Sequence, residues 1–182
     1  MQPQLFAIER AGPGRLATMA RPRGGEWLAE EMAGLAAAGV TVLVSLLTDT
    51  EMTSLGLTGE DAAAKTAGLE FLRLPTPDFH VPDRAVTLAL ARDLHARLAA
   101  GASVVVHCYG GVGRSSTLAA VVLVLDGVAP PAAWDRITVA RGRPVPETVD
   151  QRAFVNGLAG LRCNGGGRRD GGSQGDGSGP GS

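Results

Sequence analysis

Residues 103–115 read SVVVHCYGGVGRS, and this segment decides how the rest of the chain is interpreted. Its opening serine and three valines are typical of a short strand that is buried on both faces of a sheet. Three glycines lie within residues 109–113, and the almost wholly apolar run of residues 116–125 follows. A helix that is apolar on every side belongs inside a domain. The segment therefore predicts a buried strand, a glycine-rich loop and a buried helix in succession.

The same alternation of strands and helices continues on both sides. Residues 40–47 and 69–74 have the apolar composition of further strands, and residues 5–8 and 16–19 flank a Gly-Pro-Gly turn that predicts an edge hairpin. The expected helices span residues 26–38, 50–57, 59–67, 132–141 and 148–161, and a further helix is entered through Pro82 and Asp83 and closed by Gly101. On the helix that Gly101 closes, we expect an apolar stripe at i, i+4 spacing, formed by Val86, Leu90, Leu94 and Leu98.

This order of elements indicates an α/β fold, in which one central, mostly parallel sheet is flanked by helices. The ligands of such sheets bind outside the carboxyl ends of the strands. Cys108 lies two residues after the end of the strand predicted over residues 103–106, so it lies at such an end.

Composition indicates one domain and a tail. Residues 164–182 contain nine glycines and no aliphatic or aromatic side chain, so they cannot build a core. We therefore expect a folded domain over residues 1–163 and a disordered, glycine-rich tail over 164–182. The chain has seventeen basic and eighteen acidic residues, a net charge of −1, which disfavours a nucleic-acid partner bound through a broad basic field.

The chain shows no sign of export or of membrane insertion. Its two cysteines, Cys108 and Cys163, are too few for a disulfide framework or a four-cysteine zinc site. The first residues have no basic stretch followed by an apolar stretch, and the longest apolar run, over residues 118–125, is too short to span a bilayer. We expect a soluble, cytoplasmic monomer without metal or cofactor.

The glycine-rich loop has the composition of an oxyanion site. Its glycines let successive backbone N–H groups of residues 109–113 converge on one point, and the following helix adds the positive end of its dipole. Arg114 offers a planar fork of donors that matches two phosphate oxygens. The same positive surroundings favour the thiolate form of Cys108. A nucleophile that faces an oxyanion cradle predicts covalent phosphoryl transfer.

The order His107, Cys108, five residues, Arg114, Ser115 resembles the signature of the cysteine-dependent protein tyrosine phosphatase superfamily. Within it, the chain is similar to the small dual-specificity phosphatases over roughly residues 20–160. The matching segments are the loop itself, residues 75–78 and 82–83, residues 147–148 and Gln151, and residues 42–57.

The resemblance implies a role for each matching residue. Cys108 is the nucleophile, Arg114 is the phosphate clamp, Asp78 is the general acid and Ser115 aids hydrolysis of the phosphocysteine. The phosphate-binding loop comprises Tyr109, Gly110, Gly111, Val112, Gly113 and Arg114. Gln151 either positions the attacking water, as glutamine does elsewhere in the superfamily, or is an exposed helical residue. No cofactor is implied.

Several residues near these positions have alternative interpretations. Asp83 is a second candidate acid, although it is better explained as the start of a helix. We expect the buried ring of His107 to bond backbone groups and steady Cys108 rather than to transfer protons. His80 lies either in the pocket or on the solvated surface, and Cys163 either protects Cys108 by oxidation or has no role there.

Other functions fit the sequence less well. A nucleotide-binding loop requires lysine where Arg114 stands, and a dinucleotide fingerprint requires a different glycine spacing. Sulfur transfer or arsenate reduction requires a different loop length or more cysteines. A phosphoprotein-binding module would not need the complete set of Cys108, Arg114 and Asp78. The sequence thus predicts a phosphoprotein phosphatase for phosphotyrosine, with phosphoserine and phosphothreonine as further candidates. A phosphoinositide or an RNA 5′ phosphate is the alternative substrate.

Overall fold

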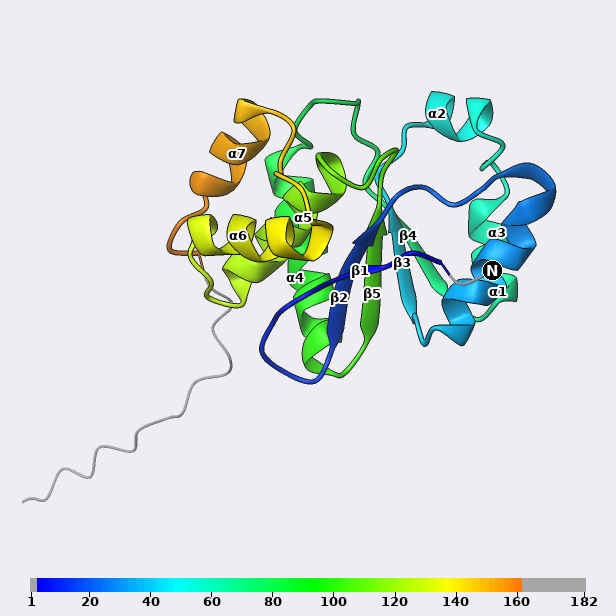
Figure 1. Ribbon diagram of the computed structural model, residues 1–182, viewed down its shortest axis with the longest axis horizontal. Helices are drawn as coiled ribbons and strands as arrows, with labels where there is room; N and C mark the ends of the chain where they lie inside the picture. The colour runs from blue at the N-terminus through cyan, green and yellow to red at the C-terminus, as the bar shows by residue number, and fades with distance from the viewer. Residues whose placement is uncertain (1–2, 162–182) are drawn as a thin grey trace, which may run out of the picture.

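The sheet places the glycine-rich loop at its centre. The computed structural model describes residues 3–161, so Cys163 and the predicted tail lie outside the described residues. Five strands follow the order β1-β2-β5-β3-β4 (Figure 1). Strands β2, β5, β3 and β4 are parallel, and β1 pairs antiparallel with β2 at one edge. The predicted hairpin and the mostly parallel sheet are therefore confirmed. The strands are β1 (Phe6–Ile8), β2 (Arg15–Met19), β3 (Val42–Ser45), β4 (Glu70–Arg73) and β5 (Ser103–His107).

Helices cover both faces of the sheet (Figure 1). On one face lie η1 (Gly25–Trp27), α1 (Leu28–Ala37) and α3 (Glu60–Thr66). On the other face lie α4 (Arg84–Ala99), α5 (Arg114–Leu125), α6 (Pro130–Arg141) and α7 (Val149–Asn156). The short helix α2 (Asp49–Ser54) follows β3 at the carboxyl ends of the strands. None of the described helices has the length and apolar composition needed to cross a membrane.

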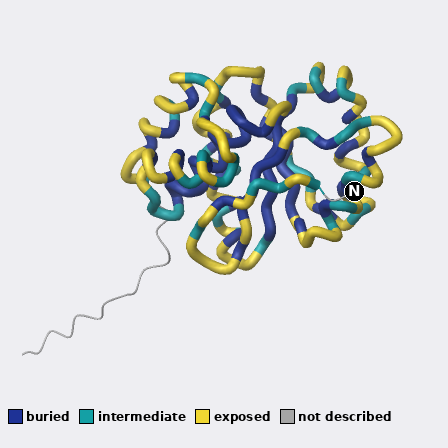
Figure 2. The backbone as a smooth tube through the Cα atoms, in the orientation of Figure 1, coloured by how far each residue is buried: buried dark blue, intermediate teal, exposed yellow. Residues whose placement is uncertain are grey.

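Two apolar layers sandwich the sheet, and β5 contributes to both. Val104 and Val106 pack with α4 and α5, whereas Val105 packs with the cluster on the α1 and α3 face. This alternation follows from the two-residue period of a strand. All residues of α5 are buried, which confirms the burial predicted for residues 116–125, and dark blue segments of the tube in Figure 2 lie around this helix and β5.

The predicted stripe on α4 is wrong in part. Leu94 and Leu98 are fully buried, but Leu90 is only half-buried and Val86 is 55% exposed. Steps of four residues exceed the 3.6-residue turn, so a stripe built on them rotates away from the core within three turns. Thr87 and Ala91 occupy the buried positions instead.

Candidate active site

The loop between β5 and α5 is shaped by close backbone packing. Gly111 has a φ of +68°, and a Cβ atom there would collide with the backbone carbonyl of Met19 in β2. At Gly113 a Cβ atom would collide with the Glu147 carboxylate. The backbone N–H of Arg21 also donates to the carbonyl oxygen of Tyr109 at 3.1 Å. Only glycine fits at position 111, where φ is positive and the obstructing atoms are backbone, whereas a side chain at position 113 would require the ends of the Glu147 and Gln151 side chains to shift.

Cys108 lies at the base of this loop. Its side chain is buried, and its Sγ lies 3.4 Å from Oγ of Ser115 in the first turn of α5. A hydroxyl at this distance can donate a hydrogen bond to a thiolate. The structure thus brings together Cys108 and Ser115, as the sequence predicts.

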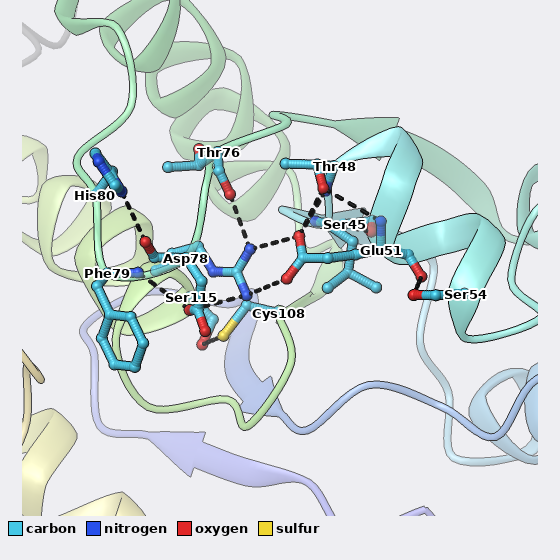
Figure 3. Close-up of polar contacts among 12 residues, drawn as sticks. Ser45, Thr48, Glu51, Ser54, Thr76, Asp78, Phe79, His80, Cys108 and Ser115 are labelled. Atoms are coloured by element: carbon cyan, nitrogen blue, oxygen red, sulfur yellow. Dashed lines mark hydrogen bonds and ion pairs between the residues drawn. The ribbon is translucent and has the colours of Figure 1, made fainter.

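Arg114 is fully buried and is held by two other elements. Its Nη1 donates to Oε2 of Glu51 at 2.9 Å and to the carbonyl oxygen of Thr76 at 2.8 Å. Its Nη2 donates to Oε1 of Glu51 at 2.8 Å and lies 3.0 Å from Oδ1 of Asp78. Figure 3 shows Glu51, Thr76 and Asp78 pointing toward one point above Cys108. Nε is buried and has no protein partner among the described residues.

Burial and neighbouring charges shift the pKa values of Arg114 and Glu51 in opposite directions. Burial lowers the pKa of Arg114, but the hydrogen bonds that it donates to Glu51 and the charges of Cys108, Glu51 and Asp78 outweigh this effect, so the pKa is raised. Burial likewise raises the pKa of Glu51, but hydrogen bonds from Arg114 and from Thr48 outweigh it, so the pKa is lowered. Both groups are therefore charged at neutral pH.

Glu51 is the main site residue that the sequence analysis missed. It belongs to a capping box, in which Oγ1 of Thr48 accepts from the Glu51 N–H and the Glu51 carboxylate accepts from the Thr48 N–H. The sequence signal for this box is a Thr-x-x-Glu pattern before an apolar residue. That pattern locates the start of α2, but it does not reveal that the same carboxylate reaches Arg114.

Asp78 and Asp83 have different surroundings. The Asp78 side chain is 44% exposed and also accepts from the Phe79 N–H at 3.1 Å. Asp83 caps α4 by accepting from the Val86 N–H at 2.9 Å, which confirms its interpretation as a helix start. His80 is exposed, and its Nδ1 lies 2.7 Å from the carbonyl oxygen of Asp78.

Gln151 is fully buried, so its interpretation as an exposed helical residue is wrong. Its Oε1 accepts from the Glu147 N–H at 3.2 Å, and its Nε2 donates to the carbonyl oxygen of His80 at 3.4 Å. The amide lies against Gly113, because the first turn of α7 packs on the loop. Gln151 thus joins the loop that carries Asp78 and His80 to the glycine-rich loop between β5 and α5.

Two further side chains hold the loop. His107 is buried as predicted, but its ring nitrogen Nε2 lies 2.9 Å from Oε1 of Glu60, so the predicted bonds to backbone groups are wrong. Arg141 donates from Nη2 to the carbonyl oxygen of Gly110 at 3.1 Å and stacks on Phe6 with 3.7 Å to the ring centroid. Burial lowers the pKa of Arg141. Neither contact has a local sequence signal. The described residues contain no group of three or more His, Cys, Asp or Glu side chains that could hold a metal.

Three comparisons place this geometry among known proteins. The model of the family described as "Swiss Army Knife protein, DSP-PTPase phosphatase domain" matches residues 7–154. The chain is 33% identical to cyclin-dependent kinase inhibitor 3 of Sus scrofa over 84 residues, which are 45% of this chain and 40% of that protein. The matched region is therefore less than half of the curated relative's length.

The solved structures agree on the fold. Kinase-associated phosphatase, with its catalytic-site cysteine replaced by serine, has a TM-score of 0.77 at 19% identity over 87% of this chain and 94% of that chain. A cysteine-to-serine variant of P. aeruginosa TpbA in complex with pTyr has a TM-score of 0.57 at 25% identity over 82% and 83% of the two chains.

Proposed function

The chain belongs to the DSP-PTPase family, and from this membership we propose that it hydrolyses phosphate monoesters on proteins through a phosphocysteine intermediate. One observation carries the proposal. Arg114, which begins the helix after Cys108, has its Nη2 3.0 Å from the Asp78 carboxylate of a different loop. A nucleophile, a phosphate clamp and an acid thus share one site at the carboxyl end of the sheet.

In the first step, the Cys108 thiolate attacks phosphorus and the bond between phosphorus and the leaving oxygen breaks. Asp78 gives its proton to that oxygen, so the leaving group departs as a neutral hydroxyl. The backbone N–H groups of residues 109–114 hold the equatorial oxygens. The product is cysteinyl phosphate on Cys108, with Asp78 ionised.

Hydrogen-bond counting on Arg114 indicates where the phosphate sits. Each Nη nitrogen has two protons, and in the free protein both protons of Nη1 face Glu51 and Thr76. One proton of Nη2 faces Glu51, and Nη2 also forms an ion pair with Asp78, whose Oδ1 is 3.0 Å away. The buried Nε has one proton and no protein partner among the described residues. The phosphate therefore takes Nε and displaces Asp78 from Nη2, which frees Asp78 to reach the leaving oxygen.

In the second step, a water molecule attacks phosphorus while Asp78 takes its proton. The bond between phosphorus and sulfur breaks, and the Ser115 hydroxyl, 3.4 Å from Sγ, donates a hydrogen bond to the departing thiolate. Gln151 positions the water, and its burial against the phosphate-binding loop supports this role. Orthophosphate leaves, and Cys108 returns to the thiolate form.

Two exposed aromatic rings favour phosphotyrosine as the substrate. No aromatic wall is evident in the sequence, but Phe79 directly follows Asp78 and is 58% exposed, and Tyr109 directly follows Cys108 and is 51% exposed (Figure 3 for Phe79). Phe79 has a φ of +61°, which is uncommon for a bulky residue and occurs at functional sites. Rings at the rim of a phosphate pocket stack well on a phenyl ring. The complex of the TpbA variant with pTyr supports the same substrate class.

The test compares substrates and traps the intermediate. Rapid acid quench with a phosphotyrosine peptide should leave a phosphoryl group on Cys108, detected by peptide mass spectrometry. Cys108→Ser should abolish turnover and still bind the peptide, whereas Cys163→Ser is the matched cysteine control. We expect phosphotyrosine peptides to be hydrolysed faster than phosphoserine or phosphothreonine peptides. Faster hydrolysis of a phosphoinositide or an RNA 5′ phosphate would overturn the protein substrate, and binding without turnover would indicate a phosphoprotein-binding module.

A further inference from the structure

The two ends of the glycine-rich loop have neighbours of opposite charge. At the end of the loop, the Asp78 carboxylate lies 3.0 Å from Nη2 of Arg114, and the Glu147 carboxylate lies beside Gly113. At its start, over residues 109–110, the charged neighbours are arginines. A second anionic group on a substrate, besides the phosphate itself, is therefore attracted to the start of the loop and repelled from its end.

Arg141, the last residue of α6, has a charge that no carboxylate neutralises among the described residues. Its Nη2 donates to the carbonyl oxygen of Gly110 at 3.1 Å, and its guanidinium stacks on Phe6 of β1. Its Nε and Nη1 are covered by protein and have no hydrogen-bond partner in the described part of the chain. A covered guanidinium without a counter-charge is unfavourable, so Arg141 favours an anionic ligand nearby.

Arg143 adds a second positive charge, two residues after Arg141. Its side chain is exposed and has no ion-pair partner within residues 3–161. Burial lowers the pKa of Arg141, the charge of Cys108 raises it, and the charge of Arg143 lowers it. Both arginines therefore belong to the surroundings of the phosphate-binding loop, and Arg143 is the one that faces solvent.

Arg21 adds a third positive charge, from the segment after β2. Its guanidinium lies 5.2 Å from the centre of the Tyr109 ring, and its Nη1 donates to the carbonyl oxygen of Pro22 at 3.3 Å. Arg21 has no carboxylate partner among the described residues, whereas Arg23, two positions later, pairs with Glu31 at 2.6 Å. Arg21 thus keeps its charge available beside the residue that follows Cys108.

We propose that Arg21, Arg141 and Arg143 form a second anion subsite, which binds an acidic side chain close to the phosphorylated residue of the protein substrate. The ligand chemistry is a carboxylate or a second phosphate, because a guanidinium binds both through paired N–H donors. The bond to Gly110 and the stacking on Phe6 hold Arg141 in place before the ligand arrives, so little side-chain freedom is lost on binding. The inference rests on the proposed function and narrows its substrates to acidic phosphoprotein segments.

The test compares the binding of two phosphotyrosine peptides to the Cys108→Ser protein, which requires no turnover. The residues on both sides of the phosphotyrosine are glutamates in one peptide and glutamines in the other. We expect the glutamate peptide to bind about tenfold more tightly at low salt, because hydrogen bonds between charged groups are the stronger ones. Isothermal titration calorimetry gives both dissociation constants. Equal constants would overturn the subsite, whereas failure of both peptides to bind would contradict the proposed function instead.

Variants in the Cys108→Ser background identify the arginines. Arg141→Met keeps an apolar stem and removes the charge, so it should bring the ratio of the two constants close to one. Arg143→Gln, at an exposed position, should lower the ratio about threefold. Arg136→Gln is the matched control on α6, because Arg136 donates to the carbonyl oxygen of Glu9 at 3.3 Å, and it should keep the full ratio. An unchanged ratio in Arg143→Gln would overturn the inference even if Arg141→Met does not fold.

A third peptide separates the two sources of the anion. It carries phosphothreonine in place of one glutamate beside the phosphotyrosine. Tighter binding than that of the glutamate peptide would identify a second phosphate as the ligand, weaker binding would identify a carboxylate, and both results support the subsite. Vesicles that contain a phosphoinositide bisphosphate provide the remaining comparison. If they displaced the glutamate peptide at a lower concentration than the third peptide does, the ligand would be a lipid headgroup and the inference would be overturned.

Discussion

The carboxylates of Asp78 and Asp83 lie five positions apart, but only Asp78 contacts Arg114. A general acid matters most for a poor leaving group and is typically worth about 10² to 10⁴-fold. We therefore expect Asp78→Asn to slow hydrolysis of phenyl phosphate or phosphoserine far more than that of an activated aryl phosphate. Asp83→Asn, the matched control, should show no such dependence on leaving-group pKa. The measurement is kcat for both variants over a series of aryl phosphates.

The dependence of kcat on pH provides a second test of Asp78 as the general acid. With a poor leaving group, Asp78→Asn should flatten the alkaline limb, because that limb reports loss of the acid's proton. The acidic limb, which depends on the Cys108 thiolate, should persist. If Asp83→Asn flattened the alkaline limb instead, the acid would be Asp83.

Glu51 is expected to act through Arg114. Glu51→Gln removes the charge that orients the guanidinium, and a misplaced clamp should lower kcat/KM by about tenfold to a hundredfold. Asp49→Asn in the same turn is the control, because its side chain is 87% exposed and pairs with Arg73 instead. Equal kcat/KM for Glu51→Gln and Asp49→Asn would show that Glu51 does not position the clamp.

The pH dependence of stability has a defined sign at Glu51. Folding lowers the pKa of Glu51 below its usual 4.5, so its contribution to stability is present above that value. The contribution is lost as the pH falls through the lowered pKa of the folded state. Denaturant unfolding from pH 6 down to about pH 3 should therefore show a smaller loss of stability in Glu51→Gln than in the wild type. An identical loss would mean that the ion pair with Arg114 contributes nothing.

For single residues, the sequence predicts the members of the motif between His107 and Ser115 but not the side chains that contact them. Cys108, Ser115, Arg114 and Asp78 lie together as expected, because a loop between a strand and a helix fixes the first three locally. The contacts of Glu51 with Arg114 and of Glu60 with His107 join residues that are far apart in the sequence. No local pattern encodes such contacts, since they depend on how whole elements pack.

At the level of secondary-structure elements, Gly111 and Gly110 in the loop between β5 and α5 provide a test variant and its control. Gly111→Ala should destabilise the fold by about 1 to 3 kcal/mol and abolish turnover, because its positive φ and the Met19 carbonyl leave no room for a methyl group. At Gly110 the nearest atom to a Cβ would be a Val112 methyl carbon at 3.9 Å, so Gly110→Ala should keep its stability. Thermal melts and phosphate release measure both effects. Similar behaviour of the two variants would contradict the steric account of the loop.

The sequence predicts some helices and strands better than others, and the difference depends on how deeply each element is buried. The buried strands and α5 are predicted well, because a continuous apolar run is stable only in the interior of the domain. The helix expected over residues 148–161 ends at Asn156, since tertiary contacts rather than periodicity set its last turn. Amphipathic helices near the surface thus carry less information about their ends and faces than fully buried ones do.

For the whole molecule, composition makes a prediction that the described residues do not address. Removing residues 164–182 should change neither the melting temperature nor turnover of a small aryl phosphate, because this segment has no apolar side chains to bury. The comparison is between the full chain and one ending at Cys163, by calorimetry and steady-state kinetics. A clear fall in either quantity would show that the segment contributes to the folded domain.

The sheet order has a consequence for how the protein emerges from the ribosome. Strand β5 lies between β2 and β3, and its residues 103–107 pair with residues 15–19 from near the start of the chain. Gly111 packs on the carbonyl group of Met19, the last residue of β2, so the shape of the glycine-rich loop depends on contact with this early strand. A nascent chain that ends before β5 has no neighbour for β2 on that side. We therefore expect β2 to stay unpaired on that side until β5 is synthesised, so that the central sheet and the glycine-rich loop form together.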